Sequence, residues 1–343
     1  MLNKILITSI GGGLATELVN QIKKTTKFKK IYITGVDMTE KTPSKFFVDK
    51  FYKVPPPDKK DYVLKMIKII KKDKINLIIP GSDLEAINLC KNRSLFENKK
   101  CFLASVDFKT LSNFTNKEKT YLSLKKNNLP CAEFYTVKNQ SDLLRVIKKF
   151  SKKEFVIKPS VSIGGRDISV FRNDISTQYF FNQKKEIHYP NKIKNLSKIK
   201  KKYEGLYPLV ISERLFPPTY DIDMLSYKGK TINVVARKRL NPQVPNDGHE
   251  VVKKKKIQNI GKKIIKSYNL SWLYDCDCMT DKKGKIKIIE INPRMSGSLA
   301  TSIIAGYPVI DNLLRLINKY KLDFKEPKKN ILVMPFKTLH KVK

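Results

Sequence analysis

The alternation of strand-type and helix-type segments in the first third of the chain most constrains its fold. Apolar runs at residues 5–9, 31–36 and 75–80 have the length and branched composition of buried strands. Segments 14–24 and 62–71 between them repeat their apolar residues at helical spacing. Strands that alternate with helices predict a parallel, doubly wound α/β sheet, which binds ligands beyond the carboxyl ends of its strands.

Glycine and acidic residues follow these predicted strands. Gly11, Gly12 and Gly13 come after the first strand, and Asp37 ends the second. This loop lacks the G-x-G-x-x-G spacing of a dinucleotide site, so a dinucleotide that uses Asp37 is kept only as an alternative. Asp83 and Glu85 follow the third strand, and we interpret them as candidates for binding an amine.

A domain boundary is predicted near residues 112 and 113. Beyond it, helices are expected at residues 116–127, 141–150 and 253–268. Residues 172–207 are polar and lysine-rich and predict no definite element. Strands are expected at residues 154–158, 168–171, 209–213, 221–227, 230–239, 272–279 and 286–291. Short turns centred on Gly229 and Gly284 join neighbouring strands, so this part is predicted to be α+β with mainly antiparallel pairing.

The charge and the cysteine content of the chain argue against several classes of function. The net charge of +39 comes mostly from lysines scattered through every segment, which is typical of solvated faces. A nucleic-acid-binding protein concentrates basic residues on one stripe with aromatic residues between them, and that class stays as an alternative. Five cysteines without a framework spacing predict reduced thiols, and no His or Cys cluster suits zinc. No apolar run reaches the roughly 18 residues of a membrane span, so we expect a cytoplasmic protein.

The segment Glu290-Ile291-Asn292-Pro293-Arg294 is the strongest candidate for chemistry. Side chains alternate along a strand, so Glu290 and Asn292 share a face, and a hairpin can bring Asp277 or Asp275 opposite them. Carboxylate and amide oxygens are the ligands that Mg²⁺ takes together with nucleotide phosphates. An exposed hairpin whose acidic residues balance nearby lysines is the alternative.

Two arginines on another predicted strand form a second candidate. Arg237 and Arg239 are two residues apart, so they face the same side, where they can bind the carboxylate of an acidic substrate. Charges on an exposed strand face are the alternative.

Five motifs in a fixed order resemble the ATP-grasp superfamily, in particular its carbamoyl-phosphate-synthase-like and carboxylate–amine ligase branches. The segment from Glu290 to Ser298 is similar to the E-x-N-P-R-x-S-G motif, and Asp277 precedes it at the family's spacing. The other matching segments are Asn116-Lys117 with Thr120 and Leu129-Pro130, Phe155 to Pro159 with Gly164-Gly165-Arg166, and Ile211 to Glu213 with Asp221 to Asp223. The resemblance covers nearly the whole chain.

This resemblance implies a pre-ATP-grasp domain at residues 1–112, a two-lobed ATP-grasp domain at 113–325 with its small lobe at about 135–212, and a tail at 326–343. It implies ATP and two Mg²⁺ ions as cofactors, with Mn²⁺ as a substitute. Metal binding would belong to Asp277, Glu290 and Asn292, and Arg294 would steady an acyl-phosphate. Nucleotide binding would belong to Lys117 (or Lys119), Lys158, Gly164, Gly165, Glu213 and Asp223.

The implied reaction phosphorylates a carboxylate with ATP and passes the acyl group to an amine, with release of ADP and phosphate. Both substrates would be small molecules, and a homodimer is compatible with the family. Two prolines, Pro217 and Pro218, replace the family's glycine turn and leave the placement of Glu213 open. The alternatives are a bicarbonate-phosphorylating enzyme and an ATP-binding protein without ligase activity.

Overall fold

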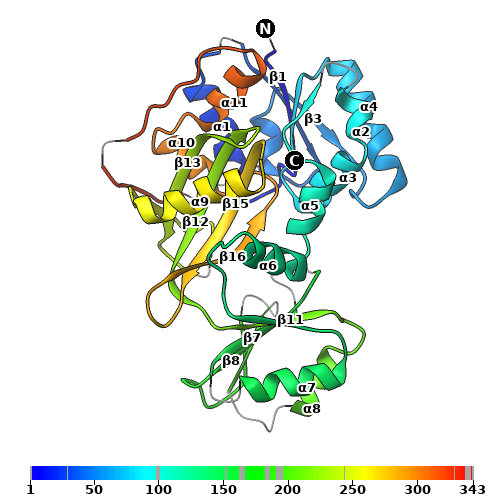
Figure 1. The fold of residues 1–343 in the computed structure, drawn as a ribbon. Helices are drawn as coiled ribbons and strands as arrows, with labels where there is room; N and C mark the ends of the chain where they lie inside the picture. The colour runs from blue at the N-terminus through cyan, green and yellow to red at the C-terminus, as the bar shows by residue number, and fades with distance from the viewer. Residues whose placement is uncertain are drawn as a thin grey trace. The chain divides into compact units, whose positions relative to one another are not determined.

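The computed structural model describes residues 2–28, 30–97, 101–150, 153–161, 167–181, 186–190, 196–242, 244–327, 329–336 and 341. The chain divides into two compact units (Figure 1). Unit 1 consists of Met1–Ser112, Pro218–Asp277 and Ile291–Lys343, and unit 2 consists of Asn113–Pro217 and Cys278–Glu290. Each unit is described by itself below.

Unit 1 begins with a five-stranded, all-parallel sheet in the order β3-β2-β1-β4-β5. Its strands are β1 (Lys4–Thr8), β2 (Tyr32–Asp37), β3 (Lys50–Lys53), β4 (Leu77–Ile79) and β5 (Phe102–Leu103). The predicted doubly wound parallel sheet is therefore confirmed. Strand β3 was not predicted, because it is short, lies at the sheet edge and carries a lysine at each end.

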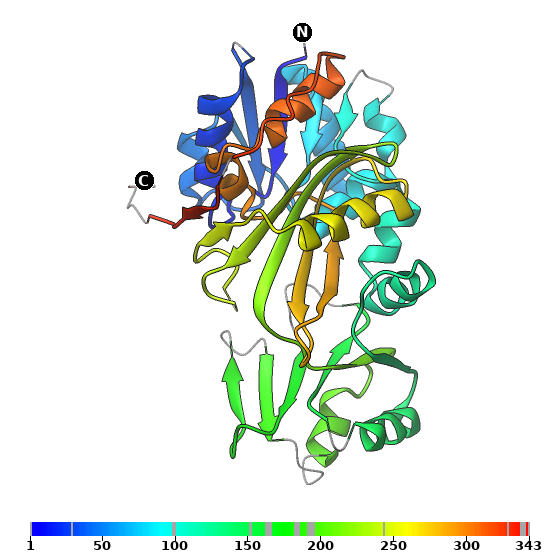
Figure 2. The same cartoon turned by 60° about the vertical axis from the view of Figure 1, so that its left-hand side comes forward.

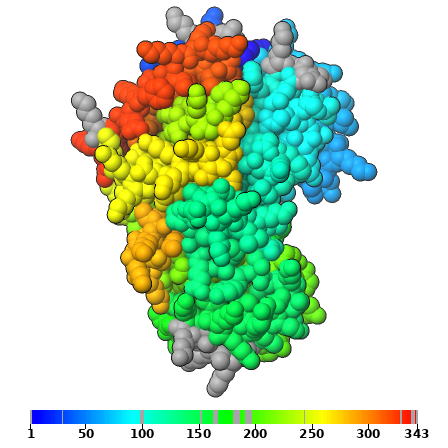
Figure 3. Space-filling view, viewed as in Figure 1, coloured from blue at the N-terminus to red at the C-terminus, as the bar shows by residue number. Residues whose placement is uncertain are grey.

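Helices cover this sheet. They are α1 (Ala15–Thr25), α2 (Lys60–Asp73), α3 (Asp83–Lys91), α4 (Arg93–Glu97), α5 (Phe108–Phe114, which ends in unit 2) and, from the C-terminal segment, α10 (Leu299–Ile304) and α11 (Val309–Ile317), with a 3₁₀ turn at Pro43–Phe46. Helices α10 and α11 pack beside α1 (Figure 2). Segments nearly 300 residues apart thus cover the same face of the parallel sheet. In Figure 3 the orange and red residues of the C-terminal segment form part of the surface of unit 1 beside the yellow residues of α9.

A second, six-stranded sheet has the order β16-β15-β12-β13-β14-β17. Its strands are β12 (Phe216–Tyr227), β13 (Lys230–Arg239), β14 (His249–Val251), β15 (Trp272–Thr280), β16 (Ile286–Asn292) and β17 (Ile331–Val333), and helix α9 (Lys255–Ser267) packs on β13. Strand pairs β12–β13, β13–β14 and β14–β17 are antiparallel, as the sequence predicted.

One hydrophobic cluster unites the two sheets of unit 1. It contains Ile5 and Ile7 of β1, Val235 of β13, and apolar residues of α1, α10 and α11. Gly261 of α9 allows a close approach to the second sheet, because an added Cβ would lie 2.8 Å from Val234. The apolar periodicity of the sequence thus becomes one core built from distant segments.

Unit 2 contains a six-stranded sheet in the order β6-β11-β7-β8-β10-β9. Its strands are β6 (Phe134–Val137), β7 (Phe155–Pro159), β8 (Ile168–Arg172), β9 (Tyr179–Phe181), β10 (Glu186–Pro190) and β11 (Leu209–Glu213), and its other helices are α6 (Lys117–Lys126), α7 (Gln140–Lys149) and α8 (Leu196–Lys202). The stretch 172–207, for which no element was predicted, supplies β9, β10 and α8.

Two further sequence expectations can be checked in these units. All five cysteines are free thiols, as predicted, and four of them are buried. None of the helices in the described ranges is long and apolar enough to cross a membrane.

Candidate functional site

A fully buried arginine organises the second sheet of unit 1. Arg237 of β13 has no solvent exposure, and its Nη2 donates to Asp223 of β12 at 2.9 Å. The same guanidinium donates to the Oγ atoms of Ser298 at 2.6 Å and Ser296 at 3.0 Å. The alternative of charges on an exposed strand face is therefore wrong for Arg237, which joins β12 and β13 to the loop after Arg294.

Asp221 is held by a second set of cationic and polar groups. Arg239 Nε donates to Asp221 at 2.9 Å, and His249 Nε2 lies 2.7 Å from its Oδ2 atom. Burial alone would raise the pKa of Asp221, but the hydrogen bond from His249 and the charges of Arg239 and Arg237 hold this pKa well below its usual range. Burial and the charge of Arg237 lower the pKa of His249 despite the contact with Asp221.

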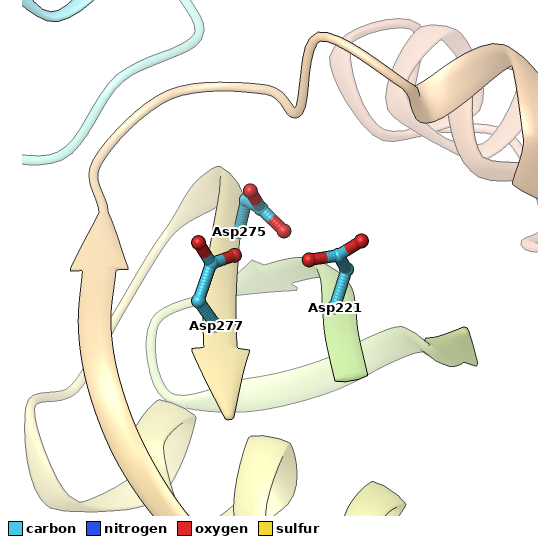
Figure 4. Close-up of side chains that lie close together, drawn as sticks. All are labelled: Asp221, Asp275 and Asp277. Atoms are coloured by element: carbon cyan, nitrogen blue, oxygen red, sulfur yellow. The ribbon is translucent and has the colours of Figure 1, made fainter. Parts of the chain in front are cut away.

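Two carboxylates on β15 face this network. Figure 4 shows the Asp275 and Asp277 side chains on β15, with the carboxylate of Asp221 turned toward them. Carboxylate oxygens of the three residues lie within 4.8 Å of one another. Burial and the charges of Asp221 and Asp223 raise the pKa of Asp275 to about 7, against the opposing charges of Arg237 and Arg294.

Arg294 lies beside the same carboxylates. Its Nη1 is 3.7 Å from Asp275 Oδ2, and its Nε is 3.3 Å from Asp83 Oδ1 at the start of α3. Asn292 Nδ2 lies 3.4 Å from Asp275 Oδ2. The structure thus brings Arg294, Asn292, Asp275 and Asp83 together in unit 1. Asp83, which was predicted as a candidate for binding an amine, pairs with Arg294.

The donor set at this place fits a hard divalent cation. Asp275 Oδ1 is buried and accepts no hydrogen bond from the described residues, and Asn292 supplies an amide oxygen. Asp277 adds a carboxylate, of which Oδ2 lies 3.1 Å from Arg239 Nη2. Asp221 is a poor ligand, because Arg239 and His249 occupy its carboxylate oxygens. Glu290, the remaining predicted ligand, precedes Asn292 by two residues on β16 and belongs to unit 2.

In unit 2, Lys158 is the best-defined candidate for nucleotide binding. It is buried near the end of β7, its Nζ donates to Tyr121 Oη at 3.0 Å, and the ammonium lies 4.9 Å from the centre of the same ring. The Lys117 amide donates to the carbonyl of Ser160 at 2.7 Å, and the buried Ser160 Oγ makes no hydrogen bond to a described residue. The start of α6 and the end of β7 therefore lie side by side. Lys117 is half-buried there, whereas Lys119 is exposed.

The other residues of unit 2 that were predicted to bind nucleotide are Glu213 and two glycines of a loop. Glu213 Oε1 accepts from the Glu133 amide at 2.9 Å, so Glu213 has a partner other than Arg214. Arg214, the neighbour of Glu213 in the sequence, pairs with Glu154 at 3.0 Å. Gly164 and Gly165 lie outside the described residues.

The N-terminal glycine loop is stabilised by its own acidic residue. The Gly11 amide donates to Asp37 Oδ2 at 2.7 Å, and the Thr39 amide donates to the other oxygen at 3.0 Å. An added Cβ at Gly11 would lie 2.8 Å from Asp37 Oδ2. Asp37 uses both carboxylate oxygens on backbone amides, an arrangement that does not favour contact with a ribose.

Three residues that contribute to these networks were not predicted as site residues: Asp221, His249 and Tyr121. Asp221 was assigned only to a strand and a motif, although its spacing from Asp223 places both on one face. His249 follows a loop and its strand is three residues long, so no periodicity marks it. Tyr121 could have been found from its position one turn after Lys117 on a predicted helix.

Comparisons with known proteins agree with this architecture. Residues 206–339 match the family model described as ATP-grasp in the biosynthetic pathway with Ter operon, and residues 5–104 match the PylC-like N-terminal domain. No curated protein matches the chain by sequence.

Solved structures share the fold at low sequence identity. N5-carboxyaminoimidazole synthetase from Staphylococcus aureus superposes with a TM-score of 0.70 at 16% identity, over 97% of this chain and 82% of that one. The biotin carboxylase domain of 2-oxoglutarate carboxylase from Hydrogenobacter thermophilus, solved with MgADP and bicarbonate, gives 0.69 at 17% identity, over 95% and 72% of the two chains. Biotin carboxylase from Campylobacter jejuni gives 0.67 at 14% identity, over 94% and 72%.

Proposed function

Because the chain belongs to the ATP-grasp superfamily, we propose that it is an ATP-dependent ligase that joins a carboxylate to an amine. The reaction would convert the carboxylate into an acyl-phosphate with ATP, and attack by the amine would give an amide and inorganic phosphate. The observation that carries this proposal is the cluster of Asp275, Asp277, Asn292 and Arg294 in unit 1, which combines oxygen ligands with a guanidinium.

The metal-binding role is proposed for Asp277, Asn292 and Glu290. When bound, Mg²⁺ would neutralise charge on the phosphoryl oxygens of ATP. The carboxylate of Asp275 contacts Asn292 and Arg294 through Oδ2, and its Oδ1 atom would contribute to the same site. The number of ions, two by resemblance, and the use of Mn²⁺ stay predictions.

Residues of unit 2 are proposed to hold the nucleotide. Lys158 would contact the phosphates, and its contact with Tyr121 limits the positions that its ammonium can take. Lys117 would assist at the start of α6, where backbone amides also favour an anion. Glu213 would bind the ribose or the adenine edge, and Gly164 and Gly165 would cover the phosphates.

Arg294 and Arg237 are proposed to have different roles. Arg294 retains partial exposure and can steady the acyl-phosphate through paired N–H groups. Arg237 is fully enclosed and bonded to Asp223, Ser296 and Ser298, so we assign it the positioning of the loop that follows Arg294. This chemistry depends on orientation and charge stabilisation, and it needs no Ser, Cys or His nucleophile.

The first test measures ADP release with Mg²⁺ across pooled carboxylates and amines. We expect Glu290→Gln to abolish turnover, since it removes a charged oxygen ligand, while the circular dichroism spectrum and melting temperature stay unchanged. Glu40→Gln, at an exposed glutamate, is the matched control and should keep full activity. Retained turnover in Glu290→Gln would contradict the metal assignment. ATP binding without turnover on any pool would favour a binding-only protein.

Bicarbonate is the second candidate for the carboxylate. The structural relatives include a biotin carboxylase domain solved with bicarbonate, and that domain shares the fold of this chain. Bicarbonate-dependent ADP release without an added organic carboxylate would favour this enzyme class. A homodimer and a cytoplasmic location also stay predictions, which gel filtration with light scattering and cell fractionation would check.

A further inference from the structure

Unit 1 contains a cavity that the proposed roles above do not use. Its volume is about 260 Å³. The wall is built by the start of α1, the loop before β14, helix α10 and the segment that includes β17. The lining residues are Leu14, Glu17, Asn246, Gly248, Ala300, Thr301, Ile304, Val333, Met334, Pro335 and Phe336.

Most of this wall is apolar and part of it is open to solvent. Ile304 is 42% exposed, Met334 66% and Phe336 89%, although all three are large hydrophobic residues. Met334 and Phe336 follow the edge strand β17, which ends at Val333. A cavity of about 150 Å³ accepts benzene, which has six non-hydrogen atoms, so a cavity of this volume accommodates a group of roughly ten non-hydrogen atoms. An apolar group of that size would cover the exposed wall.

One charge stands in this apolar surrounding. Glu17 in the first turn of α1 lines the cavity, and its Oε1 accepts a 2.6 Å hydrogen bond from Gln21 Nε2. Within the described residues Glu17 forms no ion pair, in a chain whose lysines and arginines outnumber its acidic residues by 70 to 31. The Asn246 amide and the Thr301 hydroxyl are the other polar side chains of the wall. A carboxylate beside apolar side chains is complementary to an ammonium ion on an apolar group.

The cavity wall is continuous with the buried network of Arg237. Gly248 of the wall is followed by His249, which contacts Asp221. Ala300 and Thr301 of the wall lie between Ser298, which binds Arg237, and Ser302, which donates to Asp223. A ligand in the cavity would therefore touch the elements that hold the loop after Arg294.

We propose that this cavity binds a primary ammonium carrying an apolar group of about ten non-hydrogen atoms, with Glu17 as the charge partner. The identification of this ligand as part of a substrate rests on the proposed ligase function. The substrate class is then an apolar amine or an amino acid with an apolar side chain. Binding itself requires neither ATP nor Mg²⁺.

The test uses three probes of matched size, 2-phenylethylamine, 2-phenylethanol and phenylacetate, with the full chain free of nucleotide. Saturation-transfer NMR titrations should give an affinity for the amine at least fivefold higher than for the alcohol, with the carboxylate weakest. In Glu17→Gln the advantage of the amine over the alcohol should disappear, while alcohol binding stays within twofold. Glu40→Gln is the matched control and should change none of the three affinities.

A second variant tests the cavity itself. Ile304→Trp adds bulk at a partly exposed wall position and should weaken amine and alcohol alike by tenfold or more, whereas Leu122→Trp, at an exposed position of unit 2, should have no effect. Equal affinity for the three probes, or unchanged binding in Ile304→Trp, would overturn the proposal. Probe binding with these responses, but no ADP release on any substrate pool, would refute the ligase function and leave the cavity assignment intact.

Discussion

At the scale of single residues, Arg237 is the most consequential side chain of unit 1. A guanidinium without any solvent exposure loses its hydration, and only well-placed partners offset that cost. Asp223, Ser296 and Ser298 are such partners, each at 3.0 Å or less. The serines follow the Asn292-Pro293-Arg294 segment, so the same bonds that satisfy the buried charge also fix the backbone beside the candidate metal ligands.

Removal of this cation should therefore be costly. We expect Arg237→Ala to lower the free energy of unfolding of unit 1 by about 3–5 kcal/mol, because Asp223 would be left buried and unpaired. This change is measured by urea denaturation, with the fluorescence of Trp272 as the probe. Trp272 is the chain's single tryptophan and belongs to unit 1. Lys238→Ala on the same strand is the control and should stay within about 0.5 kcal/mol. A loss below 1 kcal/mol in Arg237→Ala would contradict the argument.

The buried His249 is expected to make the stability of unit 1 depend on pH. Burial lowers its pKa below the ordinary 6.5, with Asp221 from β12 opposing this shift and Arg237 from β13 adding to it. Because the pKa of His249 is lower in the folded chain than in the unfolded chain, the unfolded chain takes up this proton first as the pH falls. Stability that is present above pH 6.5 is thus lost as the pH falls through this value.

The measurement compares urea midpoints at pH 7.5 and 5.5 for the wild type and His249→Gln. The wild-type midpoint should fall by more between the two pH values than the variant midpoint does. Equal shifts in the two proteins would show that His249 does not titrate as described. The variant comparison separates His249 from the other buried groups, such as Asp275, whose raised pKa acts in the opposite direction.

At the scale of elements, the turn between β4 and α3 lies directly against β1. Gly81 donates its amide to Thr8 Oγ1 at 3.0 Å, and an added Cβ would lie 2.2 Å from the Thr8 carbonyl oxygen. This overlap is with backbone, so the turn and β1 must move apart to relieve it. The same turn leads to Asp83, which pairs with Arg294.

We therefore expect Gly81→Ala to destabilise unit 1 by about 1–3 kcal/mol, as other overpacking changes do. Gly297→Ala is the matched control, because a Cβ there would meet no atom within 4 Å and its φ is not positive. It should be neutral or slightly stabilising. Both variants are measured by urea denaturation with Trp272 fluorescence. Equal stability of the two glycine variants would show that a Cβ at position 81 does not force β1 and the turn apart.

Elements with strong periodicity were predictable, and those without it were not. Strands β11 and β13 have the predicted bounds, and the helices α1, α2, α6, α7 and α9 shift by two residues or fewer at each end, because apolar spacing specifies them locally. Strand β12 begins at Phe216 rather than Asp221, since Pro217 and Pro218 are typical of turns but are tolerated at the beginning of a strand. Strands β14 and β17 are each three residues long. Strand β14 pairs with the preceding strand β13 across a loop, and β17 pairs with β14 from far along the chain.

The same distinction holds for the site. Asp277, Asn292 and Arg294 were identified because they lie in one contiguous motif whose strand alternation shows which residues share a face. The pairing of Arg294 with Asp83 joins residues more than 200 positions apart, and no local pattern encodes it. Burial of Arg237 was likewise not predictable, since its strand alternation is compatible with either an exposed or an enclosed face.

At the scale of the whole molecule, the charge of +39 is the property that most affects behaviour in solution. It arises from 70 lysines and arginines against 31 acidic residues, spread over elements of both units. Such a field attracts anions of every kind and is screened beyond a Debye length of about 8 Å at physiological salt. Attraction of nucleotides and carboxylates is compatible with the proposed ligase, and attraction of nucleic acids follows from the same field.

We expect this chain to bind a 20-base-pair DNA duplex without sequence preference and only at low salt. Affinity should fall by tenfold or more between 50 and 200 mM NaCl, because binding of scattered lysines to phosphates is driven by counterion release. Fluorescence anisotropy with two duplexes of equal composition and different sequence measures both properties, and ADP release with and without DNA shows whether binding affects turnover. A sequence preference of tenfold, or an affinity that persists at 200 mM, would require base contacts from a defined surface. That outcome would make nucleic-acid binding a function of the protein, whereas a steep, sequence-independent decline would leave the charge as a solvated property of an enzyme whose specificity lies in its small-molecule site.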